Sequence, residues 1–432
     1  MTARHVVRGR LLSFENGPDR PWYVEDGFLL IEDGVIAARG DLVDMPAADV
    51  PVTRYDGDLV MAGLIDTHIH YPQTQVIASY GAQLLDWLQR YTFVEEQRFA
   101  DPAHAAAVAG FFLEELFRNG TTTAAVYCTV HANSVDAFFE ASSARNSRMI
   151  AGKVMMDRGA PDGLLDTAER GHRESAAAIA RWHGRGRQRY AVTPRFAPTS
   201  SEPQLEAAGD LLRAYPDCYL QTHLSENRDE IRAVAGLFPW SANYTQVYER
   251  FGLLGPRSIF GHCIHLSAAE RRLLAESGSI AAFCPTSNLF IGSGLFDRRA
   301  MMDAGVTVSL ATDVGGGTSY SMLRTAAEAY KILQLQGQNL PSFDAFHMMT
   351  AGNALALGLQ DEIGTLEVGT AADLTVLRVG ATAAMAHRMA RVENLEQELF
   401  VLMTMGDDRA VRATWVAGVP VYTAEPQPQA SA

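Results

Sequence analysis

Histidines and an aspartate stand at the ends of several short apolar segments, and their types suit a metal ion. His68 and His70 lie two residues apart after one such segment, and His223, His262 and Asp313 each follow another. Imidazole nitrogens and carboxylate oxygens are ligands that zinc takes in catalytic sites. A metal held in this way lowers the pKa of a bound water toward about 7 and so produces a nucleophile near neutral pH. The pattern predicts a metal-dependent hydrolase.

Such a site also needs a group that accepts the proton of the water. Glu226 stands three residues after His223, in His-Leu-Ser-Glu, and is the natural candidate. Asp313 is expected to serve as a ligand and as a second proton carrier. A single histidine at a strand end is usually an ordinary surface or core residue. Metal-type residues at four separate strand ends would require a coincidence, so together they favour a metal site. We expect the ordinary role for His5, His104, His131, His172, His183, His347 and His387, and we expect His265 to begin a helix.

The middle of the chain alternates apolar strand-like runs with helical stretches. Eight such strands favour a closed (β/α)8 barrel of the TIM type, in which the carboxyl ends of the strands meet at one mouth. Residues far apart in the sequence can therefore surround one ion. The predicted strands are 59–65, 122–127, 148–155, 189–194, 218–224, 258–262, 279–283 and 306–311, and predicted helices include 102–118, 203–214, 267–277 and 319–337.

Both chain ends have short strand-like runs separated by turns, among them a hairpin at Glu32-Asp33-Gly34. We predict that these ends assemble one small composite β-sandwich. The predicted domains are therefore the N-terminal part of the sandwich at 1–60, the barrel at 61–368 and the C-terminal part of the sandwich at 369–425. The Pro-, Gln- and Ala-rich tail at 426–432 is predicted to be disordered.

Composition excludes several partners. The chain has 432 residues, a hydrophobic share of 47% and a formal net charge of −14, so no basic surface for nucleic acid or anionic membranes is expected. No apolar run approaches membrane-spanning length and the N-terminus lacks a signal-peptide core. The four cysteines form no CxxC pair, as in a reducing compartment. We expect a cytoplasmic protein without membrane or nucleic-acid partners.

Longer motifs carry a resemblance to the amidohydrolase superfamily, and within it to the guanine deaminases of the mononuclear zinc branch. The superfamily resemblance covers nearly the whole chain and includes Gly364-Thr-Leu-Glu-Val-Gly369-Thr-Ala-Ala-Asp373. The Pro-Gly usual before the first barrel strand is Ala62-Gly63 here. The more specific motifs are Asp66-Thr-His-Ile-His-Tyr-Pro-Gln73, Leu84-Leu-Asp-Trp-Leu-Gln-Arg-Tyr-Thr-Phe93, Pro194-Arg-Phe-Ala-Pro198 and Thr312-Asp-Val-Gly-Gly-Gly-Thr-Ser-Tyr-Ser321.

The resemblance implies roles for individual residues. His68, His70, His223 and Asp313 resemble the ligands of one zinc ion per chain, with iron as an alternative metal. Glu226 resembles the proton shuttle, and His262 the residue that orients water and product. Gln73, Arg195 and Phe196 match the purine-binding positions, and Trp87 lies in a segment expected over the ring, either as a lid or as a helix packed on the barrel rim. A homodimer is also expected.

These side chains suit a purine on chemical grounds as well. Arg195 offers a rigid fork of donors to a carbonyl, Gln73 both donates and accepts, and Phe196 supplies a stacking face; an ion pair beside a core aromatic is the alternative for Arg195-Phe196. The implied reaction is hydrolytic deamination of guanine to xanthine and ammonia. The alternatives are 8-oxoguanine, a pterin or a triazine as substrate, cyclic-amide hydrolysis by two metals, and a non-catalytic scaffold. The chain has no lysine between 154 and 330, which argues against a lysine-bridged metal pair.

Overall fold

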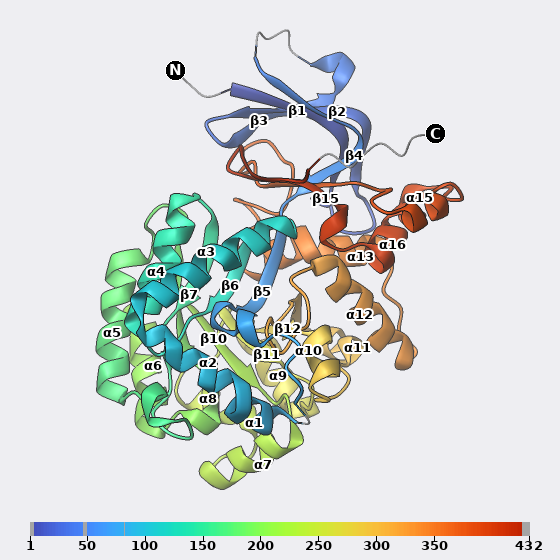
Figure 1. Cartoon of the computed structure of the whole chain (residues 1–432). Coiled ribbons are helices and arrows are strands. Elements are labelled where there is room, and N and C mark those ends of the chain that lie inside the picture. The colour runs from blue at the N-terminus through green and yellow to red at the C-terminus, as the bar shows by residue number, and fades with distance from the viewer. Residues whose placement is uncertain (1–3, 46–49, 82, 426–432) are drawn as a thin grey trace.

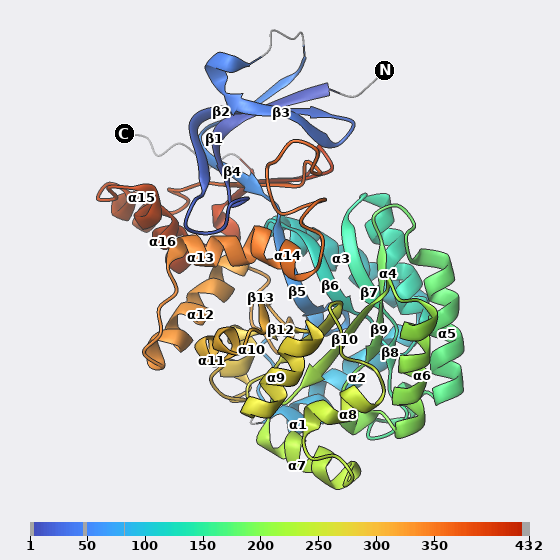
Figure 2. The ribbon, with the colours of Figure 1, turned by 180° about the vertical axis from the view of Figure 1, so that it is seen from behind.

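The structure, a computed structural model, describes residues 4–45, 50–81 and 83–425, so the tail predicted to be disordered lies outside the described residues. A barrel of parallel strands and a smaller seven-stranded sheet make up the fold (Figure 1). The small sheet lies at one end of the barrel, and Figure 2 shows the same arrangement from behind. Among the described residues, no helix has the length and apolar character needed to cross a membrane.

The barrel strands are short and almost completely buried, as expected for a parallel sheet covered by helices. Their order is β13-β12-β11-β10-β9-β7-β6-β5, and each neighbouring pair is parallel. The predicted (β/α)8 fold is confirmed. The strands are β5 (Leu64–His70), β6 (Thr121–Tyr127), β7 (Arg148–Gly152), β9 (Arg189–Pro194), β10 (Tyr219–Leu224), β11 (Ser258–His262), β12 (Ile280–Phe283) and β13 (Thr307–Leu310), with β8 (Val154–Met155) beside β9.

Helices surround these strands in both views. The predicted helix 102–118 is α3 (Pro102–Arg118), which starts at the N-cap Asp101 because its carboxylate accepts from the backbone of Ala103. The helices that precede it are α1 (Leu84–Trp87) and α2 (Phe93–Glu96), and those that follow it are α4 (Ala132–Ala144), α5 (Ala168–Trp182), α6 (Glu202–Ala214), α7 (Arg228–Leu237), α8 (Tyr244–Arg250), α9 (Ala268–Ser277), α10 (Pro285–Phe290), α11 (Arg298–Asp303), α12 (Met322–Leu335), α13 (Ser342–His347), α14 (Asn353–Ala356), α15 (Ala383–Met389) and α16 (Leu395–Met405).

The small sheet joins the two chain ends, as the sequence predicts. Its order is β16-β15-β14-β4-β1-β2-β3, in one continuous sheet whose side chains enclose a core of their own. Asp33 and Gly34, both at positive φ, form the predicted hairpin turn. The domain boundaries at 60/61 and 368/369 stay predictions. The strands are β1 (Arg4–Ser13), β2 (Trp22–Glu32), β3 (Val35–Asp41), β4 (Val52–Ala62), β14 (Leu374–Leu377), β15 (Val411–Val416) and β16 (Val419–Thr423).

Two details of the predicted strands are wrong. The strand predicted at 59–65 is the end of β4 and the start of β5, which belong to different sheets. Gly63 separates them, because a Cβ at this position would collide with the side chain of Thr122. His68 and His70 also lie within β5, whereas the predicted strand stops at residue 65. Strand β5 extends because His70 continues its hydrogen bonding, with the backbone of Val314.

The first and last barrel strands meet along a seam of buried hydrogen bonds. At the end near the small sheet, the Asn353 side chain donates to the carbonyls of Ile65 and Leu310, at 2.7 and 2.8 Å, and accepts from the Leu310 amide at 3.0 Å. Thr67 and Ser309 hydroxyls lie 2.8 Å apart in the middle of the seam. Since each edge strand would otherwise present unpaired backbone groups, these bonds close the barrel.

Replacing Asn353 with leucine should destabilise the closed barrel. The variant removes three hydrogen bonds to buried backbone groups of β5 and β13, of which only the Leu310 carbonyl keeps another side-chain donor, the Thr67 hydroxyl at 3.3 Å. A buried group left unpaired costs about 1–3 kcal/mol. The free energy of unfolding, measured by chemical denaturation, should fall by at least about 3 kcal/mol. Asn339→Leu, at an exposed position, is the control and should change it little. An Asn353→Leu variant as stable as the parent would show that the seam does not depend on this side chain.

Candidate active site

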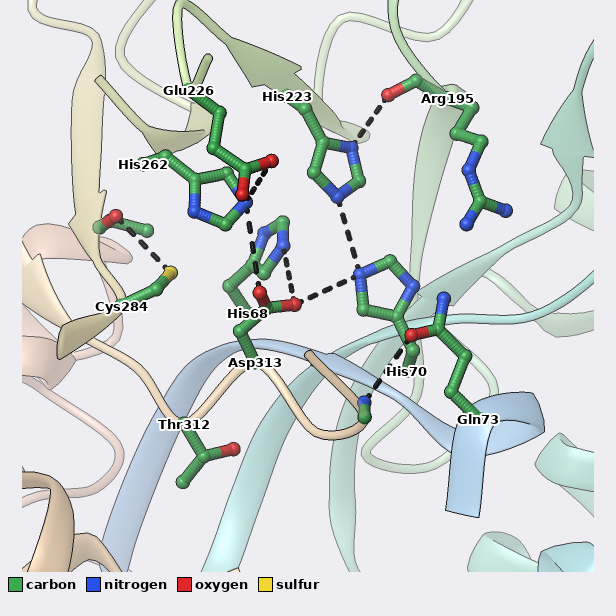
Figure 3. A network of polar contacts seen from close by, with 12 residues as sticks. His68, His70, Gln73, Arg195, His223, Glu226, His262, Cys284, Thr312 and Asp313 are labelled. Carbon is green, nitrogen blue, oxygen red and sulfur yellow. Dashed lines mark hydrogen bonds and ion pairs between the residues drawn. The ribbon is translucent and has the colours of Figure 1, made fainter. Parts of the chain in front are cut away.

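Side chains from β5, β10, β11 and the turn after β13 converge at the carboxyl end of the barrel (Figure 3). The seam sets this arrangement, because the Asp313 amide donates to the His68 carbonyl at 2.9 Å. Asp313 Oδ1 then lies 3.4 Å from His68 Nε2 and 3.2 Å from His70 Nε2. His223 Nε2 is 3.3 Å from His70 Nε2. The sequence-predicted metal ligands therefore form one cluster.

Asp66 locks the aspartate side of this cluster. Its buried carboxylate accepts from the amides of His68 and Thr312, at 3.2 and 3.1 Å, and from the Thr312 hydroxyl. It therefore ties β5 to the residue immediately before Asp313. Asp313 itself adopts a left-handed backbone with φ of 52°, a conformation that side chains rarely adopt away from functional sites. The tie explains why the motif carries an aspartate two residues before the first histidine.

A backbone contact orients His223. Its Nδ1 lies 2.7 Å from the carbonyl oxygen of Arg195. Because a carbonyl can only accept, Nδ1 carries the hydrogen and Nε2 keeps its lone pair toward the cluster. Contacts of this kind to the outer nitrogen are what orient metal-binding imidazoles.

The charges of the cluster suit a bound cation. Burial lowers the pKa of His70 to about 3 and that of His223 well below its usual range, so both rings are neutral near pH 7. Burial alone would raise the pKa of Asp313, but the imidazoles of His68 and His70 hold it well below its ordinary value. Neither buried ring nitrogen of His68 has a hydrogen-bond partner among the described residues. Neutral imidazoles, an orphaned nitrogen and a carboxylate are a donor set for a metal.

Glu226 lies next to the cluster and is held by hydrogen bonds to Glu230 and Ser293. Ser225, at φ of 51°, turns the chain after β10, and the Glu226 amide donates to Glu230 at 2.8 Å within the capping box of α7. The Ser293 hydroxyl donates to Glu226 Oε1 at 2.7 Å. Burial, reinforced by the negative charge of Asp313, raises the pKa of Glu226 to about 8. A carboxyl with a pKa near neutrality is suited to exchange protons.

His262 completes the same side of the site. Its Nδ1 is 3.0 Å from the Asn288 side-chain oxygen, and its Nε2 lies 3.3 Å from Glu226 Oε2 and 3.7 Å from Asp313 Oδ2. His262 also has a left-handed backbone, with φ of 70°. The ring therefore faces both carboxylates at once. Figure 3 shows Glu226 and His262 on one side of the histidine cluster, with Arg195 and Gln73 on the other.

A cavity of about 370 Å³ opens beside the cluster. Part of its apolar wall comes from one irregular helix of three parts: α1 (Leu84–Trp87), a π-helical turn η3 (Leu88–Thr92) and α2 (Phe93–Glu96). Leu84, Trp87 and Leu88 of this helix line the cavity, and Phe196 and Ile291 add to the wall. Trp87 is buried within this wall. The lining residues are His70, Gln73, Leu84, Trp87, Leu88, Arg195, Phe196, His223, Glu226, His262, Ile291, Asp313 and Gly316, and His68 is fully buried beside them.

Behind the polar wall lies an ion pair of Arg195; it is buried, and its partner Glu96 was not among the predicted site residues. Arg195 Nη1 donates to both carboxylate oxygens of Glu96, at 2.9 and 2.8 Å. Gln73 Nε2 donates to Glu96 Oε1 at 3.1 Å, and Gln73 Oε1 accepts from the Gly315 amide at 3.3 Å. Ser293 and Asn288 were not predicted as site residues either. Only Glu96 had a mark in the sequence, because it stands three residues after the aromatic motif that ends at Phe93.

Lys153, the lysine closest in sequence to the barrel strands, is paired with carboxylates outside the metal-type cluster. Lys153, between β7 and β8, is fully buried and forms ion pairs with Asp166 and Glu174. At the end of β9, the strand that carries a bridging lysine in two-metal relatives, the chain has Arg195, and its guanidinium is paired with Glu96. The described residues therefore offer no lysine to bridge two metals at this site.

The closed barrel, the His-x-His strand and the buried cluster of metal-type side chains at its carboxyl end define a metal-dependent hydrolase class. The profile of the amidohydrolase family matches residues 59–421. The chain belongs to the amidohydrolase family.

Within this family, the chain is similar to guanine deaminases along nearly its whole length. The guanine deaminase of Escherichia coli (strain K12) is 47% identical over 98% of this chain and 99% of its own. The solved structure of E. coli guanine deaminase matches with a TM-score of 0.95, covering 98% of this chain and 100% of that one. The structure of guanine deaminase from C. acetobutylicum with guanine bound in its active site matches with a TM-score of 0.89 at 28% identity, covering 97% and 100%.

A methyl group at Gly261 should weaken metal binding. Gly261 lies on β11, and a Cβ there would stand 2.5 Å from Cε1 of the His68 ring, so Gly261→Ala must push the imidazole out of the cluster. We expect about one metal per chain in the parent protein and clearly less in Gly261→Ala, measured by elemental analysis. Gly236→Ala, where a Cβ meets nothing within 4 Å, is the control. Full metal content in Gly261→Ala would contradict the placement of His68 as a ligand.

Proposed function

We propose that this protein is a zinc-dependent guanine deaminase, which converts guanine and water into xanthine and ammonia. The observation that carries the proposal is the placement of Arg195 and Gln73 across one cavity from the metal-type cluster and Glu226. The full-length similarity to guanine deaminases supports the same substrate.

The cavity suits a flat ring with a polar edge. Arg195 and Gln73 offer donors to the carbonyl oxygen at C6 of guanine. Phe196 and Trp87 line the cavity with aromatic faces for the ring. The carbon that carries the 2-amino group lies two ring positions from C6, on the other side of N1, so a ring whose carbonyl contacts Arg195 can turn C2 toward Glu226 and the cluster. The binding geometry therefore directs the amine toward the groups that can move protons.

We assign the metal as zinc, with iron as the alternative. His68, His70, His223 and Asp313 would hold it, because three imidazoles and a carboxylate match the ligands of catalytic zinc sites. The chemistry that zinc supplies when bound is the activation of water as a nucleophile near neutral pH.

Glu226 carries the proton through the reaction. Because Ser293 occupies Oε1, Oε2 is the atom that takes the proton of the attacking water. As the oxygen bonds to C2, Glu226 returns this proton to ring N3. The remaining proton of the hydroxyl group on C2 then passes through Glu226 to the amino nitrogen, with Asp313 sharing the transfer. The C2–N bond breaks to release ammonia, and the oxygen left on C2 becomes the second carbonyl of xanthine.

His262 positions the attacking oxygen. Asn288 holds Nδ1, so Nε2 stays directed at the space between Glu226 and Asp313. A polar group fixed there can hold the water in line with C2 and stabilise the negative charge that develops on the oxygen.

An ammonia-release screen of the zinc-loaded enzyme tests the proposal. Guanine should have the highest kcat/KM among guanine, 8-oxoguanine, a pterin, an aminotriazine and adenine. Faster turnover of a pterin or triazine would keep the deaminase chemistry and change the substrate. The cytoplasmic location and the homodimer also stay predictions, and light scattering during size-exclusion chromatography checks the dimer.

Replacing Glu226 with glutamine should stop proton transfer without removing the metal. Glutamine preserves size but cannot accept the proton, so kcat for guanine should fall by about 10²–10⁴ or more. Metal content, measured in the same preparation, should stay near that of the parent because Glu226 is not one of the proposed ligands. Near-parental turnover would move the role of base to Asp313 or His262.

Replacing Arg195 with alanine should damage recognition of the ring rather than the metal site. The contact that orients His223 is made by the Arg195 backbone, so metal content should be unchanged. Loss of a charged donor to the carbonyl should lower kcat/KM for guanine by about 10- to 100-fold or more. Adenine, which has an amine in place of that carbonyl, should be a very poor substrate of the parent enzyme. Undiminished guanine activity in Arg195→Ala would exclude this mode of recognition.

A further inference from the structure

A buried carboxylate lies behind the polar wall of the cavity and does not line it. The Glu96 side chain is about 1% exposed. It accepts from Arg195 Nη1 through both oxygens and from Gln73 Nε2 through one. The two side chains proposed to read the carbonyl edge of the ring are therefore held by one anion.

The contacts of Glu96 with Arg195 and Gln73 leave particular hydrogen-bond donors of these two side chains free for a ligand. Among the described residues, Arg195 Nη2 and Nε have no hydrogen-bond partner, whereas Nη1 is fully used by Glu96. Gln73 is fixed at both ends of its amide, by Glu96 at Nε2 and by the Gly315 amide at Oε1. Each Gln73 atom keeps one hydrogen-bonding position unused. Glu96 thus determines which atoms of both side chains remain for a ligand.

The charge of Glu96 also matters to the ligand. Phe93, one helical turn earlier, lies against the guanidinium of Arg195 with 5.4 Å from Cζ to the ring centroid. A lone guanidinium among such apolar groups would favour an anionic ligand, since burying an unpaired charge is costly. Paired with Glu96, the cation is neutralised, and its remaining donors suit an uncharged carbonyl oxygen.

We propose that Glu96 is a positioning residue that sets specificity for a neutral 6-oxo ring, acting through Arg195 and Gln73. This inference rests on the proposed function, because it takes the ring to be guanine. Glu96 is the last residue of α2, the short helix that directly follows the π-helical turn η3. The same irregular helix therefore lines the cavity and carries the carboxylate that pairs with Arg195.

The neighbouring Glu95 provides a matched control. It lies on the same short helix and is also buried, at about 8% exposed. Its carboxylate points to other partners, Arg98 at 2.8 Å and His104 at 3.2 Å. A change of Glu95 to glutamine therefore removes a buried charge from α2 without touching Arg195 or Gln73.

The test compares two non-reactive purines as competitive inhibitors of guanine deamination. Hypoxanthine has the 6-oxo group, and unsubstituted purine lacks it. The ratio of the two inhibition constants measures recognition of the 6-oxo group together with the hydrogen on N1 that accompanies it. It is determined for the full-length parent enzyme, Glu96→Gln and Glu95→Gln, together with kcat, KM and metal content.

In Glu96→Gln, hypoxanthine should bind about tenfold more weakly or worse while purine changes little, so the ratio collapses. KM for guanine should rise more than kcat falls, and metal content should be retained. Glu95→Gln should keep the parental ratio within about twofold. A merely structural role for Glu96 predicts equal weakening of both inhibitors, and that result, or an unchanged ratio, would overturn the inference.

A second variant covers the case in which Glu96→Gln does not fold. Glu96→Asp keeps the charge but withdraws it by one methylene, so it should fold and show a partial loss of the hypoxanthine preference. A parental ratio in a folded Glu96→Asp would count against the inference. If the parent enzyme does not deaminate guanine at all, the proposed function fails, and the inference falls with it. If the parent deaminates guanine and Glu96→Gln keeps the parental ratio of inhibition constants, the proposed function stands and only the inference fails.

Discussion

Closure of the barrel between its first and last strands is the constraint on which the site depends. The seam runs from Asn353 near the small sheet, through Asp66, to the backbone bonds of Asp313 and His70. If the two edges slipped by one residue, the histidines of β5 would turn to the other face of the strand. The same bonds that satisfy the strand edges therefore also set the distance between the aspartate and the two histidines.

The fold and the metal-type cluster could be predicted from the sequence because both follow from local pattern. A buried parallel strand is a short apolar run, and a polar residue at its carboxyl end must lie at the barrel mouth. His223 and Asp313 stand out for this reason although 90 residues separate them. The split of the first predicted strand at Gly63 was missed, because an apolar run gives no sign that it passes from one sheet to another.

The supporting residues could not be predicted because tertiary packing alone brings them to the site. Ser293 lies in a loop after α10, and Asn288 lies on α10 itself, so neither has a strand pattern to mark it. Glu96 looks like any charged residue near a helix end, yet it is buried against an arginine 99 positions away. The sequence indicates which groups do chemistry, whereas their partners become evident only when the helices are packed.

Arg195 contributes to the molecule in two separable ways. Its main-chain carbonyl fixes the tautomer of His223, and its side chain faces the cavity. Since any amino acid supplies the same carbonyl, the side chain at this position can be exchanged while the imidazole keeps its orientation. Removing the guanidinium would nevertheless leave the buried carboxylate of Glu96 without its cation, which is costly. A route to enzymes for other rings therefore changes Arg195 and Glu96 together, and the orientation of His223 survives both changes.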